Sequence, residues 1–239
     1  MRRLGAILAL LLPVAVLAEG AGPCRQALVL GLDVSGSVDG AEYRLQRDGV
    51  AAALTAPEVA EALFAGPGHV RLAVFEWSGP AAQRVLLPWT EIGDAEALAG
   101  AVAVLHGGVR QQSEPTTALG AAILTGARML REQNGVCWQL TLDLSGDGKS
   151  NTGPRPGEID PGALPGRMVV NGLVIGAEAD VAGPRRLVEI GELVAYFRAE
   201  VLRGPGAFVE VALGFEEFEA AMRRKLVREL RPVAVGRAE

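Results

Sequence analysis

The strongest constraint on the fold is the alternation of short, apolar, often β-branched runs with segments of helical periodicity. Runs of this length are typical of buried strands, and the helical segments between them suit the crossovers of a parallel sheet. The predicted strands are 27–33, 70–77, 84–88, 138–143, 168–175 and 208–213. We therefore expect an α/β fold, a doubly wound and mostly parallel central sheet with helices on both faces.

One predicted strand differs from the others in its connection. Only residues 78–83 separate the second and third runs, and this link is too short for a crossover helix, so 84–88 is expected to be an antiparallel edge strand. Eight glycines and prolines fall within 152–167, which predicts a loop after the fourth strand. Because no linker-like segment divides the chain, we expect a single domain over 19–239.

Apolar stripes mark the helices that should cover the sheet. Asp39 and Glu42 have the spacing of a capping box at the start of the first helix. The apolar positions that follow at helical spacing are Tyr43, Val50 and Leu54; Leu119, Ile123 and Leu130; and Phe215, Phe218, Met222, Leu226 and Leu230. We interpret these stripes as core positions.

The first 18 residues have the pattern of a signal peptide: two arginines, an apolar run interrupted by Pro13, and small residues before a cleavage site after Ala18. The run is too short and too interrupted for a membrane span, and the residues before Cys24 do not suit lipidation. The mature chain is expected to be exported, periplasmic or secreted, without stable membrane insertion.

Charge and composition narrow the function classes. With 28 acidic and 23 basic side chains, the chain carries a formal net charge of -5, which argues against nucleic acid as a partner. A hydrophobic content of 49% is enough for a full core.

The two cysteines, Cys24 and Cys137, agree with export, since an even pair in an oxidising compartment is more often a bridge than two thiols. Each lies at the start of a predicted strand, and the two would meet if those strands were parallel neighbours. Two buried free cysteines are the alternative.

Oxygen-bearing side chains follow the first and fourth strands, at the edge where open parallel sheets bind ligands. Asp33, Ser35 and Ser37 alternate after the first strand, Asp147 follows the fourth, and Thr117 opens a helix between them. Oxygens of this kind suit a hard divalent cation. Capping of turn and helix amides by the serines explains the first motif equally well, and it is the convergence of three loops that favours the ion.

These segments, in this order, resemble the metal-ion-dependent adhesion site (MIDAS) of von Willebrand factor type A (VWA) domains. The resemblance spans the mature chain, and residues 204–208 with the helix through Lys225 and Leu226 resemble a bacterial exported branch of uncharacterised function. It implies a Rossmann-like VWA fold whose first and fourth strands are adjacent, which also fits a Cys24–Cys137 disulfide.

The resemblance also implies a ligand set. Ser35, Ser37 and Thr117 would supply direct oxygen ligands to Mg²⁺ or Mn²⁺, with Asp33 and Asp147 acting largely through water, and Ca²⁺ fits less well. The adjacent Thr116 is a second candidate for the threonine position.

Neutral hydroxyls leave the ion electrophilic, so an open position attracts a carboxylate. The resemblance implies that an Asp or Glu of a protein partner supplies this carboxylate. Trp77 and the 152–167 loop are candidates for the rim that selects the partner, with burial beneath a loop as the alternative for Trp77.

Other binding motifs match less well. A phosphate loop would need glycine where Asp143 stands, and a calcium loop of EF-hand type would need glutamate where Pro154 stands.

A hydrolase using Ser35 or Ser145 would need a base, but His69 begins the second strand at the opposite end of the sheet and His106 follows a helix. We expect no enzyme. The alternatives are a metal-dependent hydrolase and a structural envelope protein in which the ion only stabilises the fold.

Overall fold

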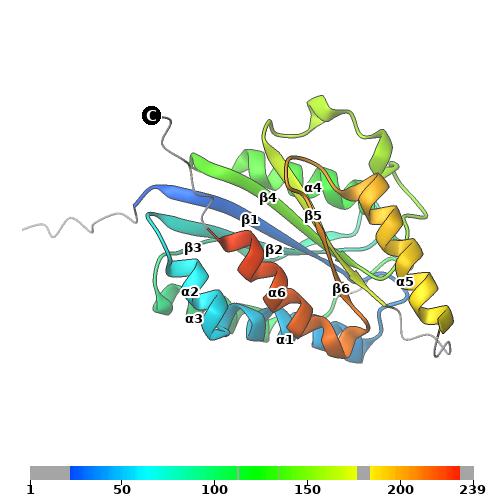
Figure 1. Cartoon of the computed structure of the whole chain (residues 1–239), viewed down its shortest axis with the longest axis horizontal. Coiled ribbons are helices and arrows are strands. Elements are labelled where there is room, and N and C mark those ends of the chain that lie inside the picture. The colour runs from blue at the N-terminus through cyan, green and yellow to red at the C-terminus, as the bar shows by residue number, and fades with distance from the viewer. Residues whose placement is uncertain (1–21, 112, 134, 177–183, 232–239) are drawn as a thin grey trace, which may run out of the picture.

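The structure is a computed structural model that describes residues 22–111, 113–133, 135–176 and 184–231. The predicted signal peptide lies outside the described residues. Six strands form one sheet in the order β3-β2-β1-β4-β5-β6 (Figure 1). The strands are β1 (Cys24–Asp33), β2 (His69–Trp77), β3 (Gln83–Ile92), β4 (Cys137–Gly146), β5 (Met168–Ile175) and β6 (Val209–Ala212).

Strand directions confirm the predicted topology. The neighbours β2-β1-β4-β5-β6 pair in parallel, and β3 pairs antiparallel with β2 at the edge of the sheet. The edge strand is longer than the predicted 84–88, since Ile92 pairs with Val70. Thr90 and Glu91 in the added part are polar and partly exposed, as an edge strand permits, so the apolar run ends before the strand does.

Helices cover both faces of the sheet, as Figure 1 shows: α4 and α5 lie on one side, and α1, α2, α3 and α6 on the other. The helices are α1 (Gly40–Thr55), α2 (Pro57–Phe64), α3 (Ala95–Gly107), α4 (Leu119–Glu132), α5 (Pro184–Tyr196) and α6 (Phe218–Leu230). The predicted loop after β4 contains only two short 3-10 turns, Pro156–Glu158 and Pro161–Ala163.

The sequence signals for α1 are confirmed in detail. The Asp39 side chain accepts from the backbone N–H groups of Ala41 and Glu42, and Glu42 Oε2 accepts from the Asp39 N–H, which completes the capping box. All of the predicted stripe positions are buried, and they lie in α1, α4 and α6 except for Phe215, which lies in the 3-10 turn before α6. These stripes therefore set which helix face meets the sheet.

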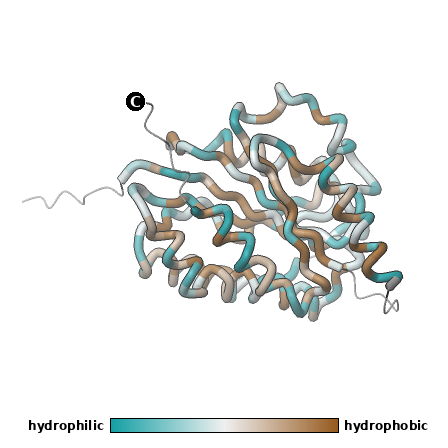
Figure 2. The backbone as a smooth tube through the Cα atoms, viewed as in Figure 1, coloured by the Kyte–Doolittle hydropathy of each residue, from teal (hydrophilic) through white to brown (hydrophobic). Residues whose placement is uncertain are grey.

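Two hydrophobic cores lie on opposite faces of the sheet. Alternate residues of β1 point to each side: Leu28, Leu30 and Leu32 pack with α1, α2, α3 and α6, whereas Ala27 and Val29 pack with α4 and α5. Figure 2 shows the central strands as the most hydrophobic part of the backbone. Continuous apolar character is typical of parallel strands buried on both faces.

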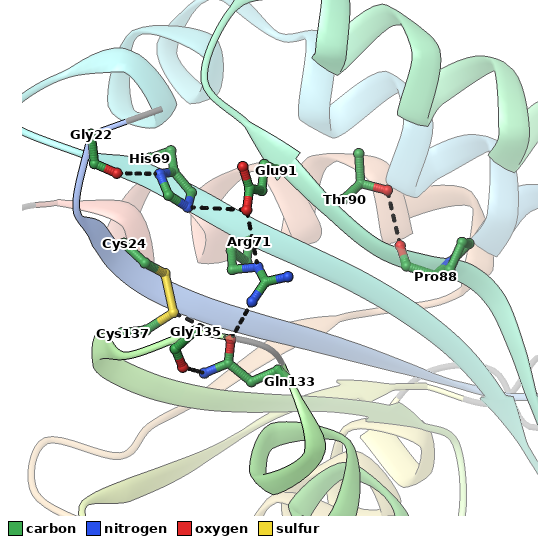
Figure 3. Close-up of polar contacts among 10 residues, drawn as sticks. All are labelled: Gly22, Cys24, His69, Arg71, Pro88, Thr90, Glu91, Gln133, Gly135 and Cys137. Carbon is green, nitrogen blue, oxygen red and sulfur yellow. Dashed lines mark hydrogen bonds and ion pairs between the residues drawn. A yellow bond between two sulfur atoms is a disulfide. The ribbon is translucent and has the colours of Figure 1, made fainter. Parts of the chain in front are cut away.

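The predicted bridge is confirmed as a Cys24–Cys137 disulfide, which joins β1 to β4 at the amino end of the sheet with a Cα–Cα distance of 4.6 Å. Arg71 of β2 lies beside it, between Glu91 (Nε to Oε1, 3.7 Å) and Gln133 (Nη1 to Oε1, 2.9 Å) (Figure 3). The disulfide end of the sheet is thus closed by covalent and polar contacts.

None of the helices in the described ranges is long and apolar enough to cross a membrane.

Candidate metal centre

The carboxyl ends of β1 and β4 carry the predicted site, at the edge of the sheet opposite the disulfide. Asp33 is the last residue of β1, and Asp147 follows Gly146, the last residue of β4. Because β1 and β4 are parallel neighbours, both carboxylates reach the same edge. Thr117 arrives from the segment just before α4.

Hydrogen bonds link all five predicted side chains into one oxygen cluster. Asp33 Oδ1 accepts from the Ser35 N–H at 2.8 Å, and the two serine hydroxyls lie 3.4 Å apart. Ser37 Oγ donates to Asp147 Oδ1 at 3.0 Å, and Thr117 Oγ1 donates to Ser35 Oγ at 3.3 Å. The structure therefore brings together Asp33, Ser35, Ser37, Thr117 and Asp147, which we call the oxygen cluster.

The cluster is buried at its base and open at its tip. Asp33 and Ser35 have no exposed surface, whereas Ser37 is exposed and Asp147 is half-buried. Burial raises the pKa of Asp33 to about 8, with a further contribution from the charge of Asp147, while hydrogen bonds from Ser35 oppose the shift. Burial also raises the pKa of Asp147, against the hydrogen bond from Ser37. Two carboxylates thus face each other, and no basic side chain of the described residues compensates their charge.

Thr117, and not Thr116, joins the cluster. The Thr117 N–H donates to Asn151 Oδ1 at 2.9 Å, and its carbonyl accepts from the Asn151 N–H (2.9 Å) and from Ser150 Oγ (3.2 Å). The buried Thr116 hydroxyl has no hydrogen-bond partner among the described residues. The loop after β4 therefore fixes the backbone that presents the Thr117 hydroxyl.

Trp77 is fully buried and forms no rim, so of the two alternatives that the sequence left open, burial is the one found. Its ring lies beneath the cluster: a Cβ at Gly146 would lie 3.4 Å from the ring and 3.1 Å from Asp33 Oδ2. The indole belongs to the core on the α4 side. Glycine at position 146 leaves room for both the indole and the carboxylate.

The donor set fits a hard divalent cation. Asp33 Oδ2 is buried without a hydrogen-bond partner in the described part of the chain, and no ion pair there involves Asp33 or Asp147. A buried carboxylate without a partner is costly, and a bound cation would satisfy it. Among the described residues, no group of three or more His, Cys, Asp or Glu side chains could hold a metal, so hydroxyl oxygens complete this set.

The residues considered for hydrolysis lie apart from one another. His69 contacts the Gly22 carbonyl at 2.8 Å at the disulfide end (Figure 3), and His106, at the end of α3, lies 3.3 Å from Asp48. Ser145 Oγ is buried and donates to the Gly31 carbonyl at 3.2 Å. Neither histidine hydrogen-bonds to a serine in the part of the chain that the structure describes.

A second group of buried charges was not predicted. Lys225 of α6 is fully buried, and its Nζ lies 2.9 Å from Asp143 Oδ1 and 2.7 Å from Glu229 Oε1. Asn171 of β5 donates to Glu229 Oε1 at 2.6 Å. A lysine inside the apolar stripe of α6 and an aspartate inside the apolar run of β4 were the available signals. We call Asp143, Asn171, Lys225 and Glu229 the lysine cluster.

Solved structures with a similar fold include a von Willebrand factor type A protein, a matrix protein and a pilus adhesin. Proximal thread matrix protein 1 (PTMP1) from the mussel byssus is 16% identical, with a TM-score of 0.58 over 88% of this chain and 49% of that chain. A PTMP1 structure with a zinc-occupied MIDAS motif has a TM-score of 0.55 at 16% identity, over 88% of this chain and 46% of that chain.

Two other solved structures give similar values. The pilus adhesin SpaC from Lactobacillus rhamnosus GG has a TM-score of 0.57 at 13% identity, over 88% of this chain and 31% of that chain. A von Willebrand factor type A protein from Catenulispora acidiphila has a TM-score of 0.50 at 16% identity, over 87% of this chain and 43% of that chain. The chain spans less than half of each of these solved chains, and the likeness establishes the VWA-type fold.

No curated protein matches the chain in sequence. The sequence model of one family matches residues 23–234, which include every strand and helix described above. The chain therefore belongs to the family described as "Protein of unknown function (DUF1194)".

Proposed function

We propose that this chain is an exported, divalent-cation-dependent protein-binding module of adhesion type, in which an acidic side chain of a partner completes the coordination of the ion. The observation that carries this proposal is the oxygen cluster, whose buried Asp33 carboxylate pairs with no basic side chain among the described residues. Hydroxyl and carboxylate oxygens at the open edge of a sheet suit Mg²⁺ or Mn²⁺.

The charge balance of the cluster supports recognition of an acidic group. Only two of the five donors are carboxylates, and the other three are neutral hydroxyls, so a bound ion keeps an electrophilic open side. Ser37 and Asp147 lie at the accessible tip, where a partner's Asp or Glu would approach. We expect no catalysis, since neither histidine hydrogen-bonds to a cluster hydroxyl among the described residues.

The similar proteins support the same reading. SpaC is a pilus adhesin, and PTMP1 has a structure with zinc in its MIDAS motif. Zinc is therefore tested beside magnesium and manganese. The disulfide fits an oxidising compartment and supports export to the periplasm or beyond.

The first experiment is calorimetric titration of the chelator-stripped chain from residue 19 onward with Mg²⁺, Mn²⁺, Zn²⁺ and Ca²⁺. Ser35→Ala and Thr117→Ala should each lose saturable binding. Thr141→Ala is the matched control, because this buried hydroxyl lies in β4 and accepts from Gln26 Nε2 at 3.0 Å, away from the cluster. Binding unchanged in Ser35→Ala would overturn the site.

The second experiment tests the partner chemistry. Terminally blocked peptides with one Asp, or with Asn in its place, are titrated against the ion-loaded chain and observed by NMR. Binding of the Asp peptide alone, abolished by chelation, supports the module. If the ion binds and raises the melting temperature but neither peptide binds, the ion only stabilises the fold and the adhesion-type function is wrong.

A further inference from the structure

A polar cavity of about 380 Å³ lies next to the metal centre, between the loop 150–156 and the carboxyl end of α5. Tyr196 and Glu200 form its helical wall. The volume falls at the small end of the range of about 300–1,000 Å³ typical of small-ligand pockets. No function described above uses this cavity.

The cavity and the metal centre share one loop. Ser150 and Asn151 line the cavity, and both also bind the backbone of Thr117. Tyr196 and Glu200 have no contact with the oxygen cluster among the hydrogen bonds and ion pairs of the described residues, so they can be changed without removing a proposed ion ligand.

Glu200 lies in a segment with an uncommon backbone conformation. It belongs to a π-helical turn, η3 (Phe197–Val201), and such turns occur frequently at functional sites. Its carboxylate packs on Gly157, where a Cβ would lie 2.0 Å from Oε2. No lysine or arginine of the described chain forms an ion pair with Glu200, so the carboxylate is available to accept hydrogen bonds from a ligand.

The remaining groups provide donors of several kinds. Tyr196 Oη accepts from the Ser150 N–H at 3.3 Å and keeps its own proton to donate. Arg155 stands at the rim with its side chain 78% exposed, in a weak pair with Glu158 at 3.4 Å. Thr152 adds a hydroxyl. The cavity lining therefore combines donors, acceptors and a half-buried aromatic side chain.

This mixture disfavours the simple ligand classes. Glu200 opposes a phosphate or another anion, Arg155 opposes a cation, and the polar lining opposes an apolar ligand. What fits is a neutral molecule with many hydroxyls, each both donor and acceptor, and with C–H faces that pack on an aromatic ring.

We propose that the cavity formed by the loop 150–156, Tyr196 and Glu200 is a binding site for a neutral saccharide, large enough for one or two sugar rings. Glu200 accepts from sugar hydroxyls, Arg155 and Tyr196 donate to them, and the Tyr196 ring packs against a sugar face. The site is separate from the oxygen cluster and does not require the ion.

The test is saturation-transfer NMR of the metal-free chain with glucose, galactose, mannose, N-acetylglucosamine and their disaccharides. At least one should bind. Glu200→Gln and Tyr196→Ala should each weaken that binding by about tenfold or more, as expected for a lost hydrogen bond to a charged group or a lost aromatic contact. Gly157→Ala should weaken it as well, because the new methyl group displaces the carboxylate.

Glu192→Gln is the matched control in the adjoining helix α5, since Glu192 is exposed and pairs with Lys149 outside this cavity. Mg²⁺ affinity and the melting temperature should stay unchanged in Glu200→Gln, which separates this test from that of the metal centre. The proposal is overturned if no saccharide binds, if binding survives both cavity variants, or if a blocked Asn-Gly-Ser peptide binds there in place of the sugars.

Discussion

The oxygen cluster and the lysine cluster both bury carboxylates in the same sheet, but only one of them contains a cation. Asp143 of β4 faces Lys225 at 2.9 Å, whereas Asp33 of β1 faces Asp147 and no basic group in the described chain. Burial raises the pKa of Asp33 and of Asp143 to about 8. Lys225 of α6 thus supplies the counter-charge for Asp143, whereas a counter-charge for Asp33 would have to come from a bound ligand.

Their positions explain the difference. The lysine cluster lies in the middle of the sheet under α6, where water and ions do not reach, and its charges bind one another. The oxygen cluster lies at the strand ends and opens toward solvent through Ser37 and Asp147. A buried charge that lacks an internal partner at an accessible edge is a sign of ligand binding, whereas the same charge with a partner is a sign of structure.

The largest expected effect is from Lys225→Met. Without the ammonium group, Asp143 and Glu229 remain buried with no counter-charge, so the free energy of unfolding should fall by about 3–5 kcal/mol in urea unfolding at pH 7. Adding Asp143→Asn and Glu229→Gln to the variant should restore much of that loss, because no charge then remains. A loss below about 1 kcal/mol in the single variant would mean that the lysine cluster is not structural.

The disulfide links β1, which carries Asp33 of the oxygen cluster, to β4, which carries Asp143 of the lysine cluster. It spans 113 residues of sequence, and its removal by Cys24→Ala with Cys137→Ala should lower the free energy of unfolding by about 2–5 kcal/mol. Ion affinity should change less than twofold, since the bridge lies at the far end of the sheet. A large loss of ion affinity in a variant that is still folded would show that the disulfide sets the spacing of the oxygen cluster.

Sequence reasoning found the sheet and the oxygen cluster because both have local signals. Strand runs are apolar, and Asp33, Ser35 and Ser37 follow one of them directly. The lysine cluster was missed, since Lys225 and Asp143 each look like an isolated exception in an apolar pattern until the fold pairs them. Two alternatives stayed open for Trp77 for a related reason: position along a strand does not reveal which layer of side chains covers it.

Asparagine substitutions should separate the two clusters by their Mg²⁺ response. Asp33→Asn removes an uncompensated charge, so the metal-free chain should gain about 1–3 kcal/mol while losing stabilisation by Mg²⁺. The raised pKa of Asp143 gives Asp143→Asn the same sign, with a smaller gain because the variant also loses a partner of Lys225, and its Mg²⁺ response should stay intact. Thermal melts with chelator and with Mg²⁺ measure both. Loss of the Mg²⁺ response in both variants would abolish the distinction between the clusters.

The pH dependence of stability separates the clusters further. A folded pKa of about 8 lies above the ordinary value of 3.8, so each aspartate favours folding at low pH and this contribution is lost as the pH rises from about 4 to 8. The slope for one proton is at most about 1.4 kcal/mol per pH unit. Saturating Mg²⁺ should remove the pH dependence due to Asp33. The substitution Asp143→Asn should remove the pH dependence that remains. Denaturant unfolding across this range gives the slopes, and a slope that Mg²⁺ leaves unchanged would contradict ion binding at Asp33.

The smallest effect on stability is expected at the open tip of the oxygen cluster. Ser37 is exposed and donates to Asp147 Oδ1 at 3.0 Å, so Ser37→Ala should change the free energy of unfolding by no more than about 0.5 kcal/mol. Its hydroxyl is nevertheless a proposed ion ligand, and Mg²⁺ affinity should fall by about tenfold, equivalent to about 1.4 kcal/mol. Calorimetric titration measures this, with Ser37→Thr as the variant that keeps the hydroxyl. If both substitutions left the affinity unchanged, the exposed half of the cluster would not touch the ion, and the site for a partner's carboxylate would have to lie elsewhere.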